Sequence, residues 1–200
     1  MGIELVYRRL PRDQFEQLQS DPEQADAFLG TGLPGLDLDD LMAAMANPEV
    51  WAEKGDAIRS TYAGRDADPT RLELGKDWHV LHFLLTGESS TEPGHREGEP
   101  LHNVVMGGRP AGFEATYGPA RWLDAETVRE VASALAGLAV EELRARFSAE
   151  AFDSAEIYPR PMPGGWEVGE LDGLLEVYPR LVQFFREAAA AGEVMVVYAA

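Results

Sequence analysis

Hydrophobic positions repeat with a period of two near both ends of the chain and at two places in its middle. In residues 3–8 the large apolar side chains Ile3, Leu5 and Tyr7 take every second position, and residues 194–198 form an apolar run. Residues 113–117 and 120–123 are similar short segments, separated by a Gly-Pro pair. This spacing is typical of β-strands and predicts strands at both termini and in the middle.

Other segments show the period of 3.6 residues that is typical of amphipathic helices. Residues 124–138 and 171–185 follow it, with Asp124 as a predicted N-cap and Gly192 as a stop signal. Pro179 predicts a kink or a break in the second of these helices. Together these elements predict an α+β fold. We expect one domain, with a mixed sheet that includes the N- and C-terminal strands and helices packed on that sheet.

Residues 21–70 contain predicted helix starts at Asp21, Asp37 and Asn47, and residues 63–70 are turn-rich. Asp21 and Pro22 have the residue types of an N-cap and a first helical position. The segment Gly30–Gly35 matches the letters of the dinucleotide fingerprint G-x-G-x-x-G. It follows a helical stretch rather than a strand, and Pro34 lacks the N–H that a phosphate would need, so we interpret it as a loop.

The segment from Lys76 to Gly87 predicts a buried helix that carries a narrow polar stripe. At 100° per residue, His79, His82 and Thr86 fall on one side of this helix, and Gly87 fits its C-terminal cap. Two interpretations stay open at this stage. The histidines are either core residues bonded to backbone groups, or part of a cleft in which His82 acts near neutral pH.

Polar and aromatic residues elsewhere could join the same cleft or simply pack. The candidate pocket that we predict consists of Trp78, His79, His82, Thr86, Tyr117, Arg121 and Tyr158. Its alternative is packing and turn hydrogen bonding by the same side chains. Zinc usually needs three or four ligands, and no second motif accompanies the two spaced histidines of the helix. We therefore expect no metal and no cofactor.

Composition narrows the possible partners and the compartment. The chain has 35 acidic and 17 basic residues, a formal net charge of −18 and no cysteine. This charge repels phosphate backbones and argues against nucleic acid as a partner. No apolar run is long enough to cross a membrane and no signal peptide is recognisable, so a cytoplasmic location is expected. An acidic surface could also attract a basic protein partner, although solubility alone explains such a charge.

Three motifs resemble the YfbM-like family of uncharacterised bacterial proteins. They are the segments 74–87, 118–123 and 142–159, in this order and spacing, and residues 170–198 look similar too. The resemblance implies one α+β domain over residues 1–200, with 21–70 as a loosely matched helical region. It implies no activity and gives no catalytic residues to carry over.

The sequence contains no complete catalytic signature, and this absence shapes the functional expectation. We expect a non-enzymatic binding or interaction module with an acidic surface. The alternative is an enzyme of unknown class that uses a cleft around His82, so whether the protein is an enzyme stays open.

Overall fold

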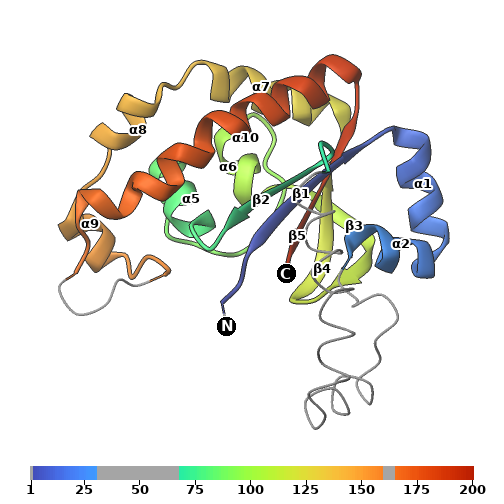
Figure 1. Ribbon diagram of the computed structural model, residues 1–200, viewed down its shortest axis with the longest axis horizontal. Helices are drawn as coiled ribbons and strands as arrows, with labels where there is room; N and C mark the ends of the chain where they lie inside the picture. Colours follow the sequence, from blue (N-terminus) through green and yellow to red (C-terminus); the bar gives the residue numbers. More distant parts are fainter. Residues whose placement is uncertain (1, 31–67, 160–164) are drawn as a thin grey trace, which may run out of the picture.

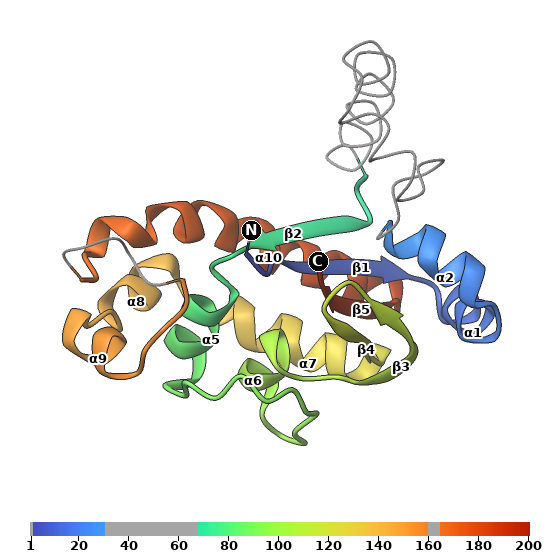
Figure 2. The ribbon, with the colours of Figure 1, turned by 90° about the horizontal axis from the view of Figure 1, so that it is seen from below.

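The computed structural model describes residues 2–30, 68–159 and 165–200. Its centre is a five-stranded sheet in the order β2-β1-β5-β4-β3. The strands are β1 (Leu5–Leu10), β2 (Arg71–Gly75), β3 (Arg109–Ala115), β4 (Gly118–Leu123) and β5 (Val194–Ala199). The two terminal strands are neighbours, as Figures 1 and 2 show, and Leu5 lies opposite Ala199 in their register. The predicted α+β class and the strands at both termini are confirmed.

The sheet differs from the expected mixed sheet in one respect: every pair of neighbouring strands is antiparallel. β3 and β4 form a hairpin, which requires antiparallel pairing, whereas parallel neighbours need a crossover that returns the chain to the same edge. The longer connections here bring the chain back in the opposite direction. Strand direction depends on these connections, which the residue pattern of a strand does not reveal.

The helices that cover the sheet have the following bounds: α1 (Arg12–Ser20), α2 (Pro22–Leu29), α5 (Trp78–Thr86), α6 (Pro100–Val105), α7 (Ala125–Ala136), α8 (Val140–Ala145), α9 (Ala149–Ser154), the 3₁₀ turn η1 (Val168–Leu171) and α10 (Asp172–Ala191). Figure 1 shows α7 and α10 side by side over the sheet. Helices α1 and α2 lie together next to β3.

Both faces of the central strands are buried. Leu5 and Tyr7 belong to the larger core cluster, to which α5, α6, α7 and α10 also contribute. Val6 and Leu10 belong to a second cluster with residues of α1 and α2. The expected alternation in β1 was therefore only half right, because helices cover both faces of this strand.

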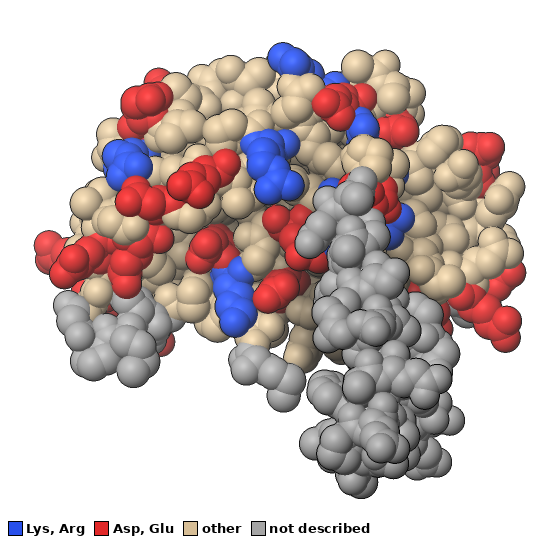
Figure 3. All heavy atoms as spheres, viewed as in Figure 1, with Lys and Arg blue, Asp and Glu red and all other residues tan. Residues whose placement is uncertain are grey.

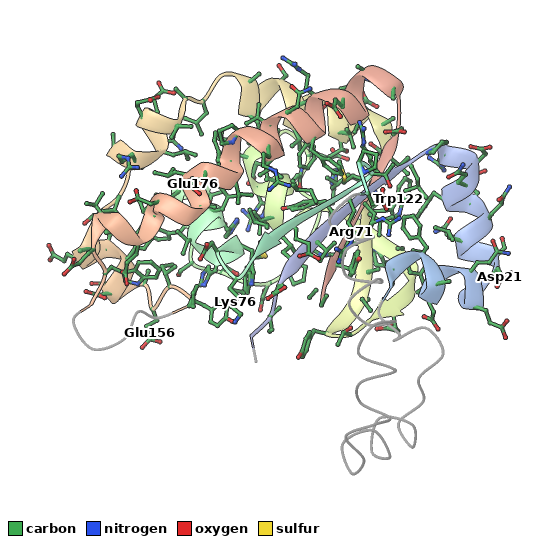
Figure 4. The ribbon with its side chains drawn as sticks, in the orientation of Figure 1. Asp21, Arg71, Lys76, Trp122, Glu156 and Glu176 are labelled. Atoms are coloured by element: carbon green, nitrogen blue, oxygen red, sulfur yellow. The ribbon has the colours of Figure 1, made fainter. Side chains whose placement is uncertain are left out.

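Several predicted helix ends are confirmed by their hydrogen bonds and backbone angles. The Asp124 carboxylate accepts from Thr127 N at 2.9 Å, and Asp21, at the outer turn between α1 and α2 in Figure 4, accepts from Gln24 N at 3.2 Å. Gly87 ends α5 at φ 77°, a left-handed conformation that glycine adopts without strain.

Two sequence interpretations need comment. Pro179 does not break α10, which runs unbroken from Asp172 to Ala191. The buried face of this helix, which includes Tyr178 and Leu181, stabilises it enough to accommodate the proline. The helix starts expected at Asp37 and Asn47, and most of the Gly30–Gly35 segment, lie outside the described residues.

Candidate functional site

Helix α5 carries most of the predicted site, and its position follows from its apolar side chains. Val80, Leu81, Leu84 and Leu85 are all buried in the larger core cluster. Trp78, the first residue of α5, is only partly buried, and its indole N–H donates to the Ile3 carbonyl at 3.0 Å. The helix is thus anchored by its aliphatic residues, and Trp78 sits at the edge of the core rather than within it.

His79 is a structural residue with both ring nitrogens bonded to backbone. Its Nδ1 accepts from the Tyr158 N–H at 3.1 Å, which places the proton on Nε2, and Nε2 bonds to the Ser89 carbonyl at 3.0 Å. The ring also stacks on Trp78, with centroids 5.4 Å apart. Burial lowers the pKa of His79, so the imidazole is neutral at physiological pH. For His79, the hydrogen bonds support the first interpretation of the stripe, that of a core residue bonded to backbone groups.

Thr86 closes the end of α5. Its hydroxyl donates to the His82 carbonyl at 2.8 Å and accepts from the Glu88 N–H at 3.0 Å. The first is the bond that a threonine side chain makes to the carbonyl four residues earlier in its helix, and the second satisfies a backbone N–H just beyond the helix end. Thr86 therefore shapes the chain between α5 and Glu88.

His82 is fully enclosed, yet neither of its ring nitrogens has a hydrogen-bond partner among the described residues. The ring faces the ring of His102 from α6, with centroids 5.4 Å apart in an edge-to-face arrangement. Burial, reinforced by the nearby His102, lowers the pKa of His82 to about 4. A neutral, enclosed imidazole without partners is unusual, because buried polar groups are nearly always bonded.

Sequence reasoning missed the two residues that surround His82. His102 is buried and comes from α6, and Glu88 comes from the turn after α5. Each of these groups offers one ligand-type atom, and the three atoms all lie within 4.8 Å of one another. The available signal was a pair of polar residues, His102 and Asn103, inside an otherwise apolar segment.

The loop between α5 and α6 is fastened to α6 by three sets of bonds. Gly94 N donates to the Met106 carbonyl at 2.8 Å, and the Gly94 carbonyl bonds to His102 Nε2 at 3.1 Å. The Asn103 side chain bonds to both backbone groups of Arg96, at 3.0 and 2.7 Å. This loop is therefore ordered by backbone contacts, and it positions Glu88 and His102 relative to each other.

A separate cavity of about 260 Å³ contains the rest of the predicted pocket. Trp78, Tyr117 and Arg121 line it together with mostly apolar residues, which are Ile3, Leu5, Thr91, Pro93, Val105, Met106, Pro119, Tyr198 and Ala199. Tyr117 is 49% exposed at its rim. Tyr158 packs against Trp78, with ring centroids 5.8 Å apart, and does not line the cavity.

Arg121 is the charged group of this cavity. Its Nη1 donates to the Gly107 carbonyl and its Nη2 to the Val105 carbonyl at 3.1 Å. Within the described residues it forms no ion pair, and burial lowers its pKa, with the nearby Tyr7 opposing that effect. A guanidinium has five N–H donors and never loses its charge in proteins, so Arg121 holds a fixed positive charge with donors to spare.

The structure thus divides the predicted pocket in two. One part is the enclosed cluster of His82, His102 and Glu88, and the other is the Arg121 cavity with Trp78 and Tyr117. His79, Thr86 and Tyr158 support these parts by hydrogen bonding and packing.

The fold and these two sites define a small α+β protein in which helices cover both faces of an antiparallel sheet, with no helix in the described ranges long and apolar enough to cross a membrane. The chain belongs to the family described as domain of unknown function DUF1877, whose model matches residues 1–198. The resemblance to YfbM-like proteins is confirmed.

The chain is also similar to one individual protein in sequence and to one solved structure in fold. Protein YfbM of Escherichia coli (strain K12) is 32% identical over 106 residues, an alignment that spans 52% of this chain and 58% of that protein. The crystal structure of a protein of unknown function, YfbM from Escherichia coli, matches with a TM-score of 0.57 at 20% identity. That match covers 98% of this chain and 99% of the other, and it establishes the shared fold.

Proposed function

We propose that the protein is a binding module for small anionic ligands that carry an apolar or aromatic group. The observation that carries this proposal is Arg121, a fixed positive charge without an ion-pair partner in the part of the chain described, set in a mostly apolar cavity. Ligand sites typically combine apolar walls with a few placed polar groups that fix orientation. The guanidinium N–H groups that are not bonded to the Gly107 and Val105 carbonyls suit a carboxylate or phosphate oxygen.

The walls of the cavity favour a flat or apolar ligand body. Trp78 and Tyr117 contribute aromatic surface, and Val105 and Met106 contribute aliphatic surface. A volume of about 260 Å³ suits a molecule smaller than a typical drug. The proposal therefore concerns small organic anions rather than nucleotides or peptides.

This proposal is tested with benzoate and its uncharged analogue benzamide as a matched pair of probes. We expect saturable benzoate binding by calorimetry, accompanied by a shift of the NMR signal of the Trp78 indole N–H. Benzamide, which lacks the charge, should bind much more weakly. The Arg121→Met variant should bind benzoate at least about tenfold more weakly, which corresponds to the 1.4 kcal/mol that a modest charge-assisted contact contributes.

Arg109→Met is the matched control, because Arg109 is an exposed arginine of the neighbouring strand β3 and does not line the cavity. Tyr117→Ala tests the rim without disturbing buried backbone, since this side chain is half exposed. Equal binding of benzoate and benzamide, or unchanged benzoate affinity in Arg121→Met, would refute anion recognition at this cavity.

The alternative of an enzyme centred on His82 receives less support. A catalytic base must come within hydrogen-bond reach of its substrate, and His82 is fully enclosed. The expected basic protein partner stays a prediction from charge alone. On the face in Figure 3 acidic side chains are interspersed with Lys and Arg, and a pull-down at low and high salt would test for a salt-sensitive basic partner.

A further inference from the structure

The cluster of His82, Glu88 and His102 combines the residue types and the spacing of a metal site. Both histidines are buried, at 0% and 3% exposure, and the Glu88 side chain is 41% exposed. His102 Nδ1 is 3.8 Å from Glu88 Oε2, and the three ligand-type atoms lie within 4.8 Å of one another. None of these three residues lines the Arg121 cavity.

The hydrogen bonds of His102 leave one nitrogen available in a defined direction. Its Nε2 bonds to the Gly94 carbonyl at 3.1 Å, which requires the proton to be on Nε2. Nδ1 therefore carries a lone pair, and this buried atom has no hydrogen-bond partner in the part of the chain that the structure describes. Metal-binding histidines usually donate their second ring N–H to a backbone carbonyl or carboxylate in this way, which fixes the tautomer and aims the ligand atom.

His82 presents a second unsatisfied nitrogen to the same space. Within residues 2–30, 68–159 and 165–200, neither Nδ1 nor Nε2 has a hydrogen-bond partner, although the side chain is fully buried. His79, one turn earlier on the same helix, provides the contrast, since both of its nitrogens are bonded to backbone. The lack of partners is thus specific to the two histidines that face each other and Glu88.

We propose that His82, His102 and Glu88 form a binding site for a divalent transition-metal ion of the zinc type. Two imidazoles and one carboxylate are a known zinc ligand set, in which a fourth position is left for water. Ligand atoms around tetrahedral zinc are about 3.3 Å apart, as follows from metal–ligand distances of about 2.0–2.1 Å. The cluster must therefore contract, and the partly exposed Glu88 side chain is the group with room to move.

Arg96 is the neighbouring group that shapes this site. Its Nη1 bonds to both Glu88 oxygens, at 2.9 and 3.0 Å, and also to Glu99 at 3.1 Å. A carboxylate can bind a metal through one oxygen and keep a hydrogen bond on the other, so Arg96 can hold Glu88 in place. Its positive charge also opposes a cation, which predicts a moderate rather than a very high affinity.

The test is a titration of the chelator-treated full-length protein with Zn²⁺ by calorimetry, and with Co²⁺ by visible absorption. We expect one saturable site, a tetrahedral Co²⁺ spectrum, and a Zn²⁺-dependent rise in melting temperature, because a ligand of the folded state alone stabilises it. Glu88→Gln and His102→Gln should each weaken Zn²⁺ binding at least tenfold. Glu88→Gln changes a partly exposed side chain, so it tests the site even if His102→Gln fails to fold.

Two control variants separate this site from general surface binding. Glu99→Gln removes another carboxylate partner of Arg96 that lies outside the cluster, and His95→Gln removes a histidine of the same loop. Both should bind Zn²⁺ like the unaltered protein. The proposal is overturned if the unaltered protein shows no saturable Zn²⁺ binding, or if Glu88→Gln and the controls bind equally well. Benzoate binding does not enter this test, so either proposal can fail without the other.

Discussion

The enclosed neutral His82 predicts a specific loss of stability in mild acid. Its ordinary pKa of 6.5 applies in the unfolded chain, whereas burial lowers the pKa to about 4 in the folded protein. Between these pH values the unfolded state binds a proton that the folded state does not. Stability therefore falls as the pH is lowered from 6.5 towards 4 and this contribution then levels off.

The magnitude follows from the two pKa values. Each unit of difference corresponds to 1.36 kcal/mol, so His82 contributes about 3 kcal/mol over the whole range and about 2 kcal/mol by pH 5. Burial is the main cause of the lowered pKa of His82. Of the charged or titratable groups around it, His102, His79 and Arg96 oppose protonation of His82, and Glu88 favours it.

The assay is urea unfolding of the unaltered protein and of His82→Gln from pH 7 to pH 4.5, with a chelator present so that metal binding does not contribute. The variant loses the titrating group, so its stability should fall less steeply with acid. The gap between the two proteins should narrow by about 2 kcal/mol between pH 7 and pH 5. Carboxylates titrate in both proteins and cancel in this difference.

Leu84→Ala is the matched control, since Leu84 is buried on the same helix and does not titrate. It should lower stability by about 2–5 kcal/mol at every pH and keep the steepness of the unaltered protein. If the unaltered protein and His82→Gln lose stability in parallel between pH 6.5 and 5, His82 is not held neutral and the reasoning is refuted.

Substitutions at three further positions test other parts of the structure by urea unfolding at pH 7. Trp78→Ala should cost about 2 kcal/mol, below the 3–5 of a fully buried aromatic, because Trp78 lies at the core edge; a larger loss would contradict that position. Gly107→Ala should cost about 1–3 kcal/mol, since the added Cβ would collide with Asn103. Unchanged stability would contradict this, because it would mean that the backbone at Gly107 can move away from Asn103 at little cost. Asp124→Ala should cost about 1 kcal/mol through the lost cap, while Asp124→Asn should retain most stability; equal losses would assign the effect to the ion pair with Arg109.

Local rules account for the parts of the fold that the sequence predicted. Gly87 and Asp124 end and start helices because their residue types satisfy backbone groups within a few positions. Strand direction depended on distant connections, and the burial of Val6 depended on α1 and α2 covering the second face of the sheet. These are properties of the whole chain that a short pattern does not contain.

The candidate site was predictable only where its residues share one element. His79, His82 and Thr86 were found on α5 because helical spacing relates them. His102 lies on a different helix, and the contact of its ring with His82 follows from the packing of α6 on α5. Arg121 was identified from its place beside a motif, but its lack of an ion-pair partner in the described ranges appears only in three dimensions.

The two proposed sites share one supporting segment, residues 88–107. Within it, Glu88 and His102 belong to the metal cluster, while Thr91 and Met106 line the Arg121 cavity. Backbone bonds such as Gly94 N to the Met106 carbonyl join the two parts.

A metal ion that draws Glu88 inward would act on the same loop that walls the cavity. If that changes the benzoate affinity by some factor, benzoate must change the Zn²⁺ affinity by the same factor, because coupling between binding sites is reciprocal. Measuring both affinities would therefore distinguish a coupled loop from two sites that merely adjoin.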